Sequence, residues 1–242
     1  MLISPKHKFI FFKPMKCAGS SIEASLYEHC TKDAICTGGV NLQKTGWEYI
    51  PQNNGDRDTT FFHGHTWPEL LWQRFKRSDF SDYKKITVVR NPWDQLVSYY
   101  WWNHQAIKEQ FPSLAINEDD SRAKVQSKFY SYISKDMWSK GYKNKSEYIW
   151  GSPLGFISSI NESFIVDDIT DYLVFENLND QFTKLCSEIG ITDPFLKKLK
   201  SHHRNAADHY SDYYNPDAAE LVATYYKKTI EAFNYKFEGA NR

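Results

Sequence analysis

Two segments of the chain combine small and basic residues in a way that suits anion binding. Residues 13–21 (KPMKCAGSS) follow a short apolar run, and their small side chains would let a ligand approach the backbone. Serine hydroxyls, the Lys16 ammonium and the N–H groups of a helix beginning there would together attract a phosphate-like group. The GxxxxGK[ST] pattern of a Walker A loop is absent, so this would be an anion site of another kind.

The second segment is VVRNPWDQLVSYY, in which Arg90 ends an apolar run and Ser98 lies about two helical turns further on. Arginine suits phosphate because its planar fork of donors matches the oxygen geometry. Arg90 and Ser98 are therefore candidates for a second anion site.

His63-Gly64-His65 lies between these two segments. Imidazole can act as a general base because its ordinary pKa, about 6.5, lies near working pH. An HxH pair can equally be structural, or half of a metal site, but no third ligand has suitable spacing, so we predict no metal. The tripeptide therefore offers two candidate bases, and His65 is preferred to His63.

The elements that must position these residues alternate between strands and helices. Apolar or β-branched runs predict strands at 8–12, 85–90 and 172–175. Helices are expected after each of them, and the alternation predicts an α/β fold with a central, mainly parallel sheet flanked by helices, in a single domain over residues 1–242.

Several helix ends can also be predicted. Ser20 or Ser21 is a plausible N-cap of the first helix, with Glu23 in its first turn. Pro68 and Pro92 suit the first turns of two more helices, and Gly190 would close the helix after the third strand. Further helices are expected around 121–140 and from about 216 to 233, whereas 110–165 shows no motif.

The motifs resemble those of the sulfotransferases that use 3′-phosphoadenosine 5′-phosphosulfate (PAPS). KPMKCAGSSIE is similar to the 5′-phosphosulfate loop of that family, particularly its carbohydrate branch. By the resemblance Lys16, rather than Lys13, is the loop lysine, and the donor-binding residues of the loop are Lys16, Cys17, Ala18, Gly19, Ser20 and Ser21. The resemblance also implies the P-loop-kinase-like sulfotransferase fold.

VVRNPWDQLVSYY is similar to the family's 3′-phosphate motif, which implies that Arg90 and Ser98 hold the 3′-phosphate of PAPS. Gln95 departs from it, since the family often has arginine there. DDITDYLVFENLNDQFTKLCSEIGI and the tail from 203 to 237 also resemble family segments, so the resemblance covers most of the chain and is weakest over 110–165.

The His-Gly-His tripeptide resembles the Golgi-type branch that sulfates sugar 2-hydroxyls, where a histidine removes the acceptor proton. This implies an in-line transfer of a sulfuryl group from PAPS to a hydroxyl of a small molecule or glycan, with His65 or His63 as the base and Lys16 stabilising the leaving group. Glu176 is an alternative base. His202, His203 and Arg204 could contribute to the nucleotide pocket or form a solvated cluster.

Two other functions stay open. A kinase-like, nucleotide-dependent phosphotransferase would need a Walker A lysine and a Mg²⁺ carboxylate, and no clear pair is present. A non-catalytic nucleotide-binding protein could keep the fold, although retention of Lys16, Arg90, Ser98 and the histidines speaks against it.

Composition limits the partners. Lys plus Arg and Asp plus Glu both total 30, so no basic excess favours nucleic acid. No segment is long and apolar enough to span a bilayer, and four scattered cysteines without a secretion signal favour reduced thiols. We expect a cytoplasmic protein that binds neither nucleic acid nor membrane. Aromatic residues make up 17% of the chain, which favours a tyrosine-rich core over a sugar platform.

Overall fold

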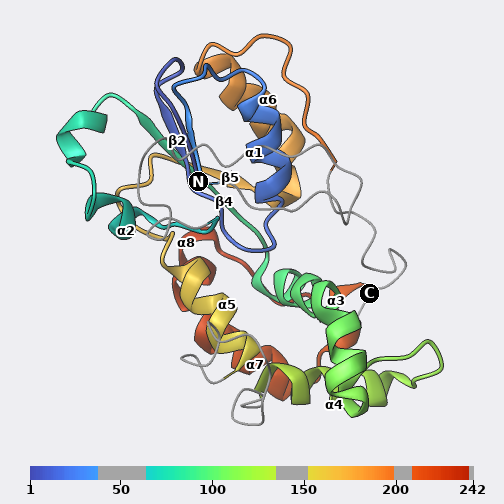
Figure 1. The fold of residues 1–242 in the computed structure, drawn as a ribbon. Coiled ribbons are helices and arrows are strands. Elements are labelled where there is room, and N and C mark those ends of the chain that lie inside the picture. Colours follow the sequence, from blue (N-terminus) through green and yellow to red (C-terminus); the bar gives the residue numbers. More distant parts are fainter. Residues whose placement is uncertain (38–63, 135–151, 199–208, 240–242) are drawn as a thin grey trace. The chain divides into compact units, whose positions relative to one another are not determined.

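The computed structural model of this chain describes residues 1–37, 64–134, 152–198 and 209–239. The chain forms two compact units (Figure 1). The first unit comprises Met1–Arg90 and Ser163–Leu199, and the second comprises Asn91–Glu162 and Lys200–Arg242. A single domain over the whole chain stays a prediction.

A five-stranded sheet organises the first unit, within the residues described. Its strand order is β3-β1-β2-β4-β5, and the strands are β1 (Leu2–Ser4), β2 (Phe9–Phe11), β3 (Ile35–Cys36), β4 (Lys84–Val89) and β5 (Asp171–Val174). Strands β2, β4 and β5 pair in parallel. Because β1 is antiparallel to both β2 and β3, it alone runs against the other four. The predicted α/β fold with a mainly parallel sheet is confirmed.

One face of the sheet is covered by α1 (Gly19–Tyr27) and α6 (Leu178–Glu188), which lie side by side in Figure 1. The apolar side chains of α6 recur at helical spacing and pack with α1 and the strands in one buried cluster. Gly190, at φ 71°, lies just after α6, as predicted. The buried cluster of α1, α6 and the strands holds β2 and β4 in place. The loop that begins at Lys13 follows the end of β2, and Arg90 follows the end of β4.

The remaining elements of the first unit are short. They are α2 (Pro68–Trp72) and the 3-10 turns η2 (Arg77–Phe80) and η6 (Phe175–Asn177). Pro68 begins α2, which confirms its predicted place in a first turn. Strands β1 and β3 were not among the predicted strands.

The second unit is helical in the part of the chain described. It contains α3 (Pro92–Gln110), α4 (Arg122–Ser134), α5 (Pro153–Glu162), α7 (Pro216–Tyr225) and α8 (Lys227–Phe233), with the 3-10 turns η3 (Pro112–Leu114) and η7 (Tyr210–Tyr213). Asn91 caps α3, since its side chain accepts from the N–H groups of Trp93 and Asp94 at 3.0 and 3.2 Å. The predicted final helix is divided into α7 and α8 at Tyr226.

Aromatic residues fill the interior of the second unit. The Tyr100 ring packs edge-on against Phe129 and Tyr132, with centroids 5.8 and 5.1 Å away. Its buried hydroxyl donates to Leu114 O at 3.0 Å and accepts from Ile116 N at 2.7 Å. The predicted tyrosine-rich core is confirmed for these residues.

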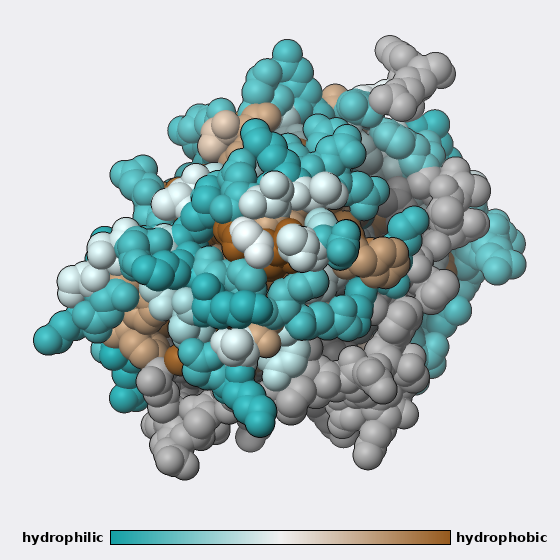
Figure 2. Space-filling view, turned by 90° about the horizontal axis from the view of Figure 1, so that it is seen from above, coloured by the Kyte–Doolittle hydropathy of each residue, from teal (hydrophilic) through white to brown (hydrophobic). Residues whose placement is uncertain are grey.

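The described apolar residues on the face seen in Figure 2 form only small patches among hydrophilic ones. Trp102, Phe195 and Tyr225 are the large apolar side chains exposed within the described ranges. Among the helices described, none combines the length and hydropathy needed to cross a membrane.

Candidate active site

The loop after β2 turns sharply before α1 begins. Lys16 and Ala18 adopt left-handed backbone angles, with φ of 60° and 58°. Helix α1 starts at Gly19, which places Ser20 and Ser21 in its first turn. Ala18 is the N-cap and makes no side-chain cap, so the predicted cap at Ser20 or Ser21 is wrong because the helix begins earlier. The loop thus leads directly into a helix N-terminus, where anions are stabilised.

Lys13 does not extend from the loop as a free cation. Its ammonium forms an ion pair with the Glu23 carboxylate, and both side chains are almost fully buried, at 4% and 5% exposure. Glu23 therefore serves as a buried counter-ion and not as the predicted first-turn acid. Lys16, the loop lysine of the sequence motif, is half-buried.

A glycine is required at position 19 because the Lys13 side chain packs closely against its α-carbon. A Cβ atom at Gly19 would lie 2.4 Å from Lys13 Cγ and 3.4 Å from the carbonyl oxygen of Pro14. The lysine stem passes so close to the α-carbon of Gly19 that no larger residue fits without a shift. The glycine thus lets the loop fold tightly over the buried ion pair.

Arg90, just after β4, contacts the loop directly. Its Nη1 donates to the carbonyl oxygen of Lys16 at 2.9 Å. Its guanidinium also lies over the Phe175 ring, 4.0 Å from the centroid, in a cation–π contact. The two candidate anion segments meet here because β2 and β4 are parallel neighbours, with Phe11 opposite Ile86.

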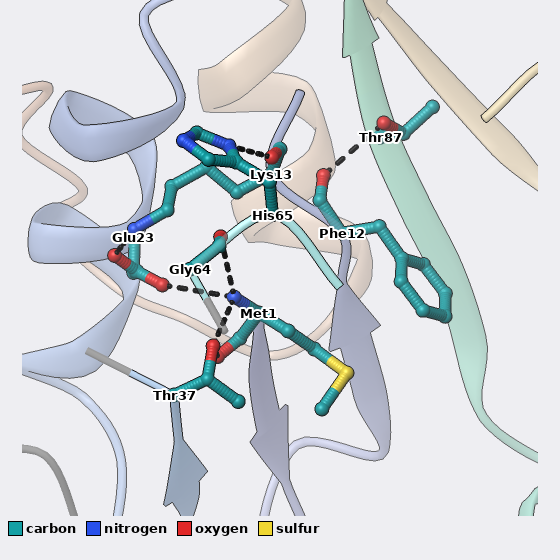
Figure 3. A network of polar contacts seen from close by, with 8 residues as sticks. All are labelled: Met1, Phe12, Lys13, Glu23, Thr37, Gly64, His65 and Thr87. Atoms are coloured by element: carbon teal, nitrogen blue, oxygen red, sulfur yellow. Dashed lines mark hydrogen bonds and ion pairs between the residues drawn. The ribbon is translucent and has the colours of Figure 1, made fainter. Parts of the chain in front are cut away.

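The strand ends are joined by two further contacts. Phe12 N donates to Ile86 O at 2.8 Å, and Thr87 Oγ1 donates to Phe12 O at 3.1 Å. The second contact is drawn in Figure 3. These bonds hold the start of the loop against β4.

His65 precedes α2 and lies against the loop. Its Nδ1 is 2.8 Å from the carbonyl oxygen of Lys13 (Figure 3). A carbonyl oxygen only accepts, so Nδ1 carries the proton and the neutral ring has its basic lone pair on Nε2. His63 lies outside the described residues, as do His202, His203 and Arg204. Within the described part, the histidine predicted as the base lies beside the predicted anion loop.

The structure also describes four other residues that the sequence analysis named: Cys17, Ser98, Glu176 and Gln95. Cys17 is buried, and its thiol faces Met15 O at 3.3 Å. Ser98 is half-buried in α3 and belongs to the second unit, whereas Arg90 belongs to the first. Glu176, the alternative base, is exposed in η6. Gln95 is buried in α3.

The sequence analysis gave neither Glu23 nor Phe175 a role in this site. Glu23 lies ten positions after its partner Lys13, and Phe175 lies far along the chain from Arg90. No local pattern marks either pair, because each contact depends on the tertiary fold. The one available signal for Phe175 was its position directly before Glu176-Asn177-Leu178, in a segment that resembles the family's.

The strand-loop-helix arrangement, with Arg90 beside it, defines an α/β protein with a candidate anion site at the ends of parallel strands. A family model described as the Sulfotransferase family matches residues 1–236. The chain therefore belongs to the Sulfotransferase family, and it is an enzyme that transfers sulfuryl groups. Among the described residues, no group of three or more His, Cys, Asp and Glu side chains could hold a metal ion.

Among solved structures, the chain is similar to a sulfotransferase from Alicyclobacillus acidocaldarius. The identity is 13% and the TM-score is 0.43, over 94% of this chain and 96% of that one. No curated protein matches the chain.

Proposed function

We propose that the sulfuryl donor is PAPS and that the acceptor is a hydroxyl of a carbohydrate or glycoconjugate. The observation that carries the donor proposal is the contact between Arg90 and the loop, where Nη1 donates to Lys16 O at 2.9 Å. A helix N-terminus and the Arg90 guanidinium, which contacts the Lys16 backbone, thus lie at the ends of two adjacent parallel strands. A nucleotide that carries phosphates at both its 5′ and 3′ positions needs such a pair of anion sites.

In this proposal the loop residues, from Lys16 to Ser21, bind the 5′-phosphosulfate. Arg90 binds the 3′-phosphate, and Ser98 is assigned to the same phosphate by the sequence motif alone. Arg90 can do so while its guanidinium stays on Phe175, because the stack uses the face of the guanidinium whereas donation to a phosphate uses its edge.

The transfer is an in-line displacement at sulfur. The acceptor oxygen forms a bond to sulfur while the bond from sulfur to the bridging phosphate oxygen breaks. The acceptor proton passes to Nε2 of His65, and the electron pair of the broken bond leaves on the phosphate oxygen of 3′-phosphoadenosine 5′-phosphate (PAP). Lys16 and the N–H groups at the start of α1 stabilise that developing charge.

Histidine 65 suits the base role because its Nδ1–H is held by Lys13 O, which leaves Nε2 to accept a proton. A carbohydrate acceptor is favoured by the His-Gly-His motif of the carbohydrate branch. His63 and Glu176 are the alternative bases, and single substitutions to Gln separate the three.

The donor proposal is tested by calorimetric titration with PAP, with ADP and AMP as controls. PAP should bind more tightly than either, and Arg90→Ala should weaken PAP binding by roughly 10- to 100-fold, because charge-assisted hydrogen bonds are lost. Arg77→Ala is the matched control, since Arg77 is an exposed arginine of the same unit. Equal affinity for PAP and ADP would contradict the 3′-phosphate site.

Turnover is then measured as PAP released from PAPS, with desulfated heparin and small sugars offered as acceptors. His65→Gln should lower the rate by roughly 100-fold or more if His65 is the base. A full rate in His65→Gln would move the base role to His63 or Glu176. Transfer of phosphate from ATP instead would favour the kinase-like alternative.

A further inference from the structure

A buried ion pair lies directly beneath the loop and is not used by the transfer reaction. Lys13 and Glu23 form it, and the side chain of each is about 95% buried. Figure 3 shows that the Glu23 carboxylate also faces the amino group of Met1, 3.3 Å away. That amino group in turn donates to Thr37 Oγ1 at 2.8 Å. Burying charges is costly unless they are paired, so this cluster needs a structural or functional reason.

Lys13 is held at both ends of the residue. Its ammonium is fixed by Glu23 on α1, while its carbonyl oxygen accepts from Nδ1 of His65 at 2.8 Å. Between these ends, the stem passes against Gly19, where even one added carbon would be 2.4 Å away. The side chain therefore has little freedom, and the direction of the Lys13 carbonyl is tied to helix α1.

The direction of that carbonyl decides the proton position on His65. Neutral histidine exists as two tautomers, and the hydrogen bond made by one nitrogen selects between them. A carbonyl fixed against Nδ1 selects the Nδ1–H form, which leaves Nε2 able to accept a proton. Without it, the ring would populate the Nε2–H form, which presents a donor where the proposed reaction needs an acceptor.

We propose that Lys13 and Glu23 are positioning residues that hold His65 in its Nδ1–H tautomer. This inference rests on the proposed role of His65 as the base. Neither residue touches the donor or the acceptor; both act through the Lys13 carbonyl. The prediction is that breaking the pair changes the tautomer of His65 and the turnover rate, whereas donor affinity changes little.

The test uses a double variant, Lys13→Met with Glu23→Gln. A single substitution would leave one charge buried without its partner and could unfold the protein, whereas the double variant keeps both side-chain shapes without the charges. The matched control removes an exposed ion pair of the same unit, Lys8→Met with Asp82→Asn. Both proteins are compared with the parent chain by PAP calorimetry, which checks that the loop still binds.

The deciding measurement is the ¹⁵N chemical shift of the two His65 ring nitrogens, assigned by comparison with His65→Gln. It is made at about pH 8, where histidine is neutral. Met1 is then neutral as well, because burial lowers the pKa of its amino group to about 6. The parent chain and the control should show Nδ1–H, and the double variant should show a large share of Nε2–H.

Turnover is measured in parallel as PAP released from PAPS with desulfated heparin. In the double variant kcat should fall roughly 10- to 100-fold, as expected for a misdirected catalytic group, with the Kd of PAP changed less than about threefold. Unchanged ¹⁵N shifts in the double variant would overturn the inference, as would changed shifts with an unchanged kcat. If His65→Gln itself keeps full turnover, the proposed base fails first, and that result is distinct from the other two.

Discussion

The close packing of Gly19 against Lys13 makes Gly19→Ala the most informative single substitution. The new Cβ would lie 2.4 Å from Lys13 Cγ and 3.3 Å from Cδ. Carbon atoms in contact are ordinarily about 3.5–4.0 Å apart, so the two groups must separate by about 1 Å. The lysine cannot simply turn away, because Glu23 and His65 hold its two ends.

The expected cost is therefore that of an overpacked interior, about 1–3 kcal/mol in the free energy of unfolding. Urea unfolding measures it as a lower midpoint at an unchanged slope. The displaced loop should also weaken PAP binding by roughly tenfold or more, measured by calorimetry. Gly239→Ala is the matched control, because nothing lies within 4 Å of a Cβ there.

A double-mutant cycle identifies the cause. Lys13→Ala, made together with Glu23→Gln so that no charge is buried without its partner, removes the Cγ and Cδ atoms. The cost of Gly19→Ala should be smaller in that background, with a coupling energy of about 1 kcal/mol or more. If Gly19→Ala costs the same with and without the lysine stem, the proposed steric conflict does not exist. A fully stable Gly19→Ala protein with normal PAP affinity would refute it outright.

Three further substitutions test the second unit. Asn91→Ala removes the cap of α3 and should cost about 1 kcal/mol in urea unfolding, whereas a gain in stability would contradict the cap. Tyr100→Phe leaves the buried Ile116 N–H without its acceptor and should cost about 1–3 kcal/mol; an unchanged midpoint would argue against that bond. Burial lowers the pKa of His104 below its ordinary value, so the fold favours the neutral ring. The stability that the neutral His104 ring contributes is complete above about pH 6.5 and is lost as the pH falls through the lowered pKa. The His104→Gln protein should therefore lose less stability than the parent chain on acidification from about pH 7 to pH 5.

Much of the fold was predictable because its signals are local. The strands at 9–11, 84–89 and 171–174 are apolar runs rich in β-branched and aromatic residues, and such runs mark buried strands. The helix starts at Pro68 and Pro92 follow from a fixed φ angle and a missing N–H group. Each signal lies within a few residues of the feature that it predicts.

Other features depend on contacts between distant residues and could not be predicted. Strand β3 has only two residues, and β1 joins the sheet through antiparallel pairing with β2 and with β3, which no local pattern marks. Helix α5 begins at Pro153, within a stretch where the sequence showed only turn signals. A proline there suits a turn and a helix start equally well, so composition alone could not separate them.

The candidate site likewise combines features that the sequence predicts with one that depends on tertiary contacts. The loop and Arg90 were identifiable because their residue types alone suit anions, and the structure brings them within hydrogen-bonding distance. The partnership of Lys13 with Glu23 was not identifiable, since a glutamate near a helix start has a simpler local explanation in the helix dipole. The role of Glu23 as the counter-ion of Lys13 is visible only in the structure, in which the lysine stem passes Gly19.

The left-handed backbone at Lys16 and Ala18 has an energetic consequence for the loop. Residues with a Cβ pay about 1–2 kcal/mol each in that conformation, so the loop is strained before any ligand arrives. The strain is sustained by the packing at Gly19 and by the hydrogen bond from Arg90. Folding has therefore already oriented the loop, so under the proposed function a donor would bind without the entropy loss of ordering it.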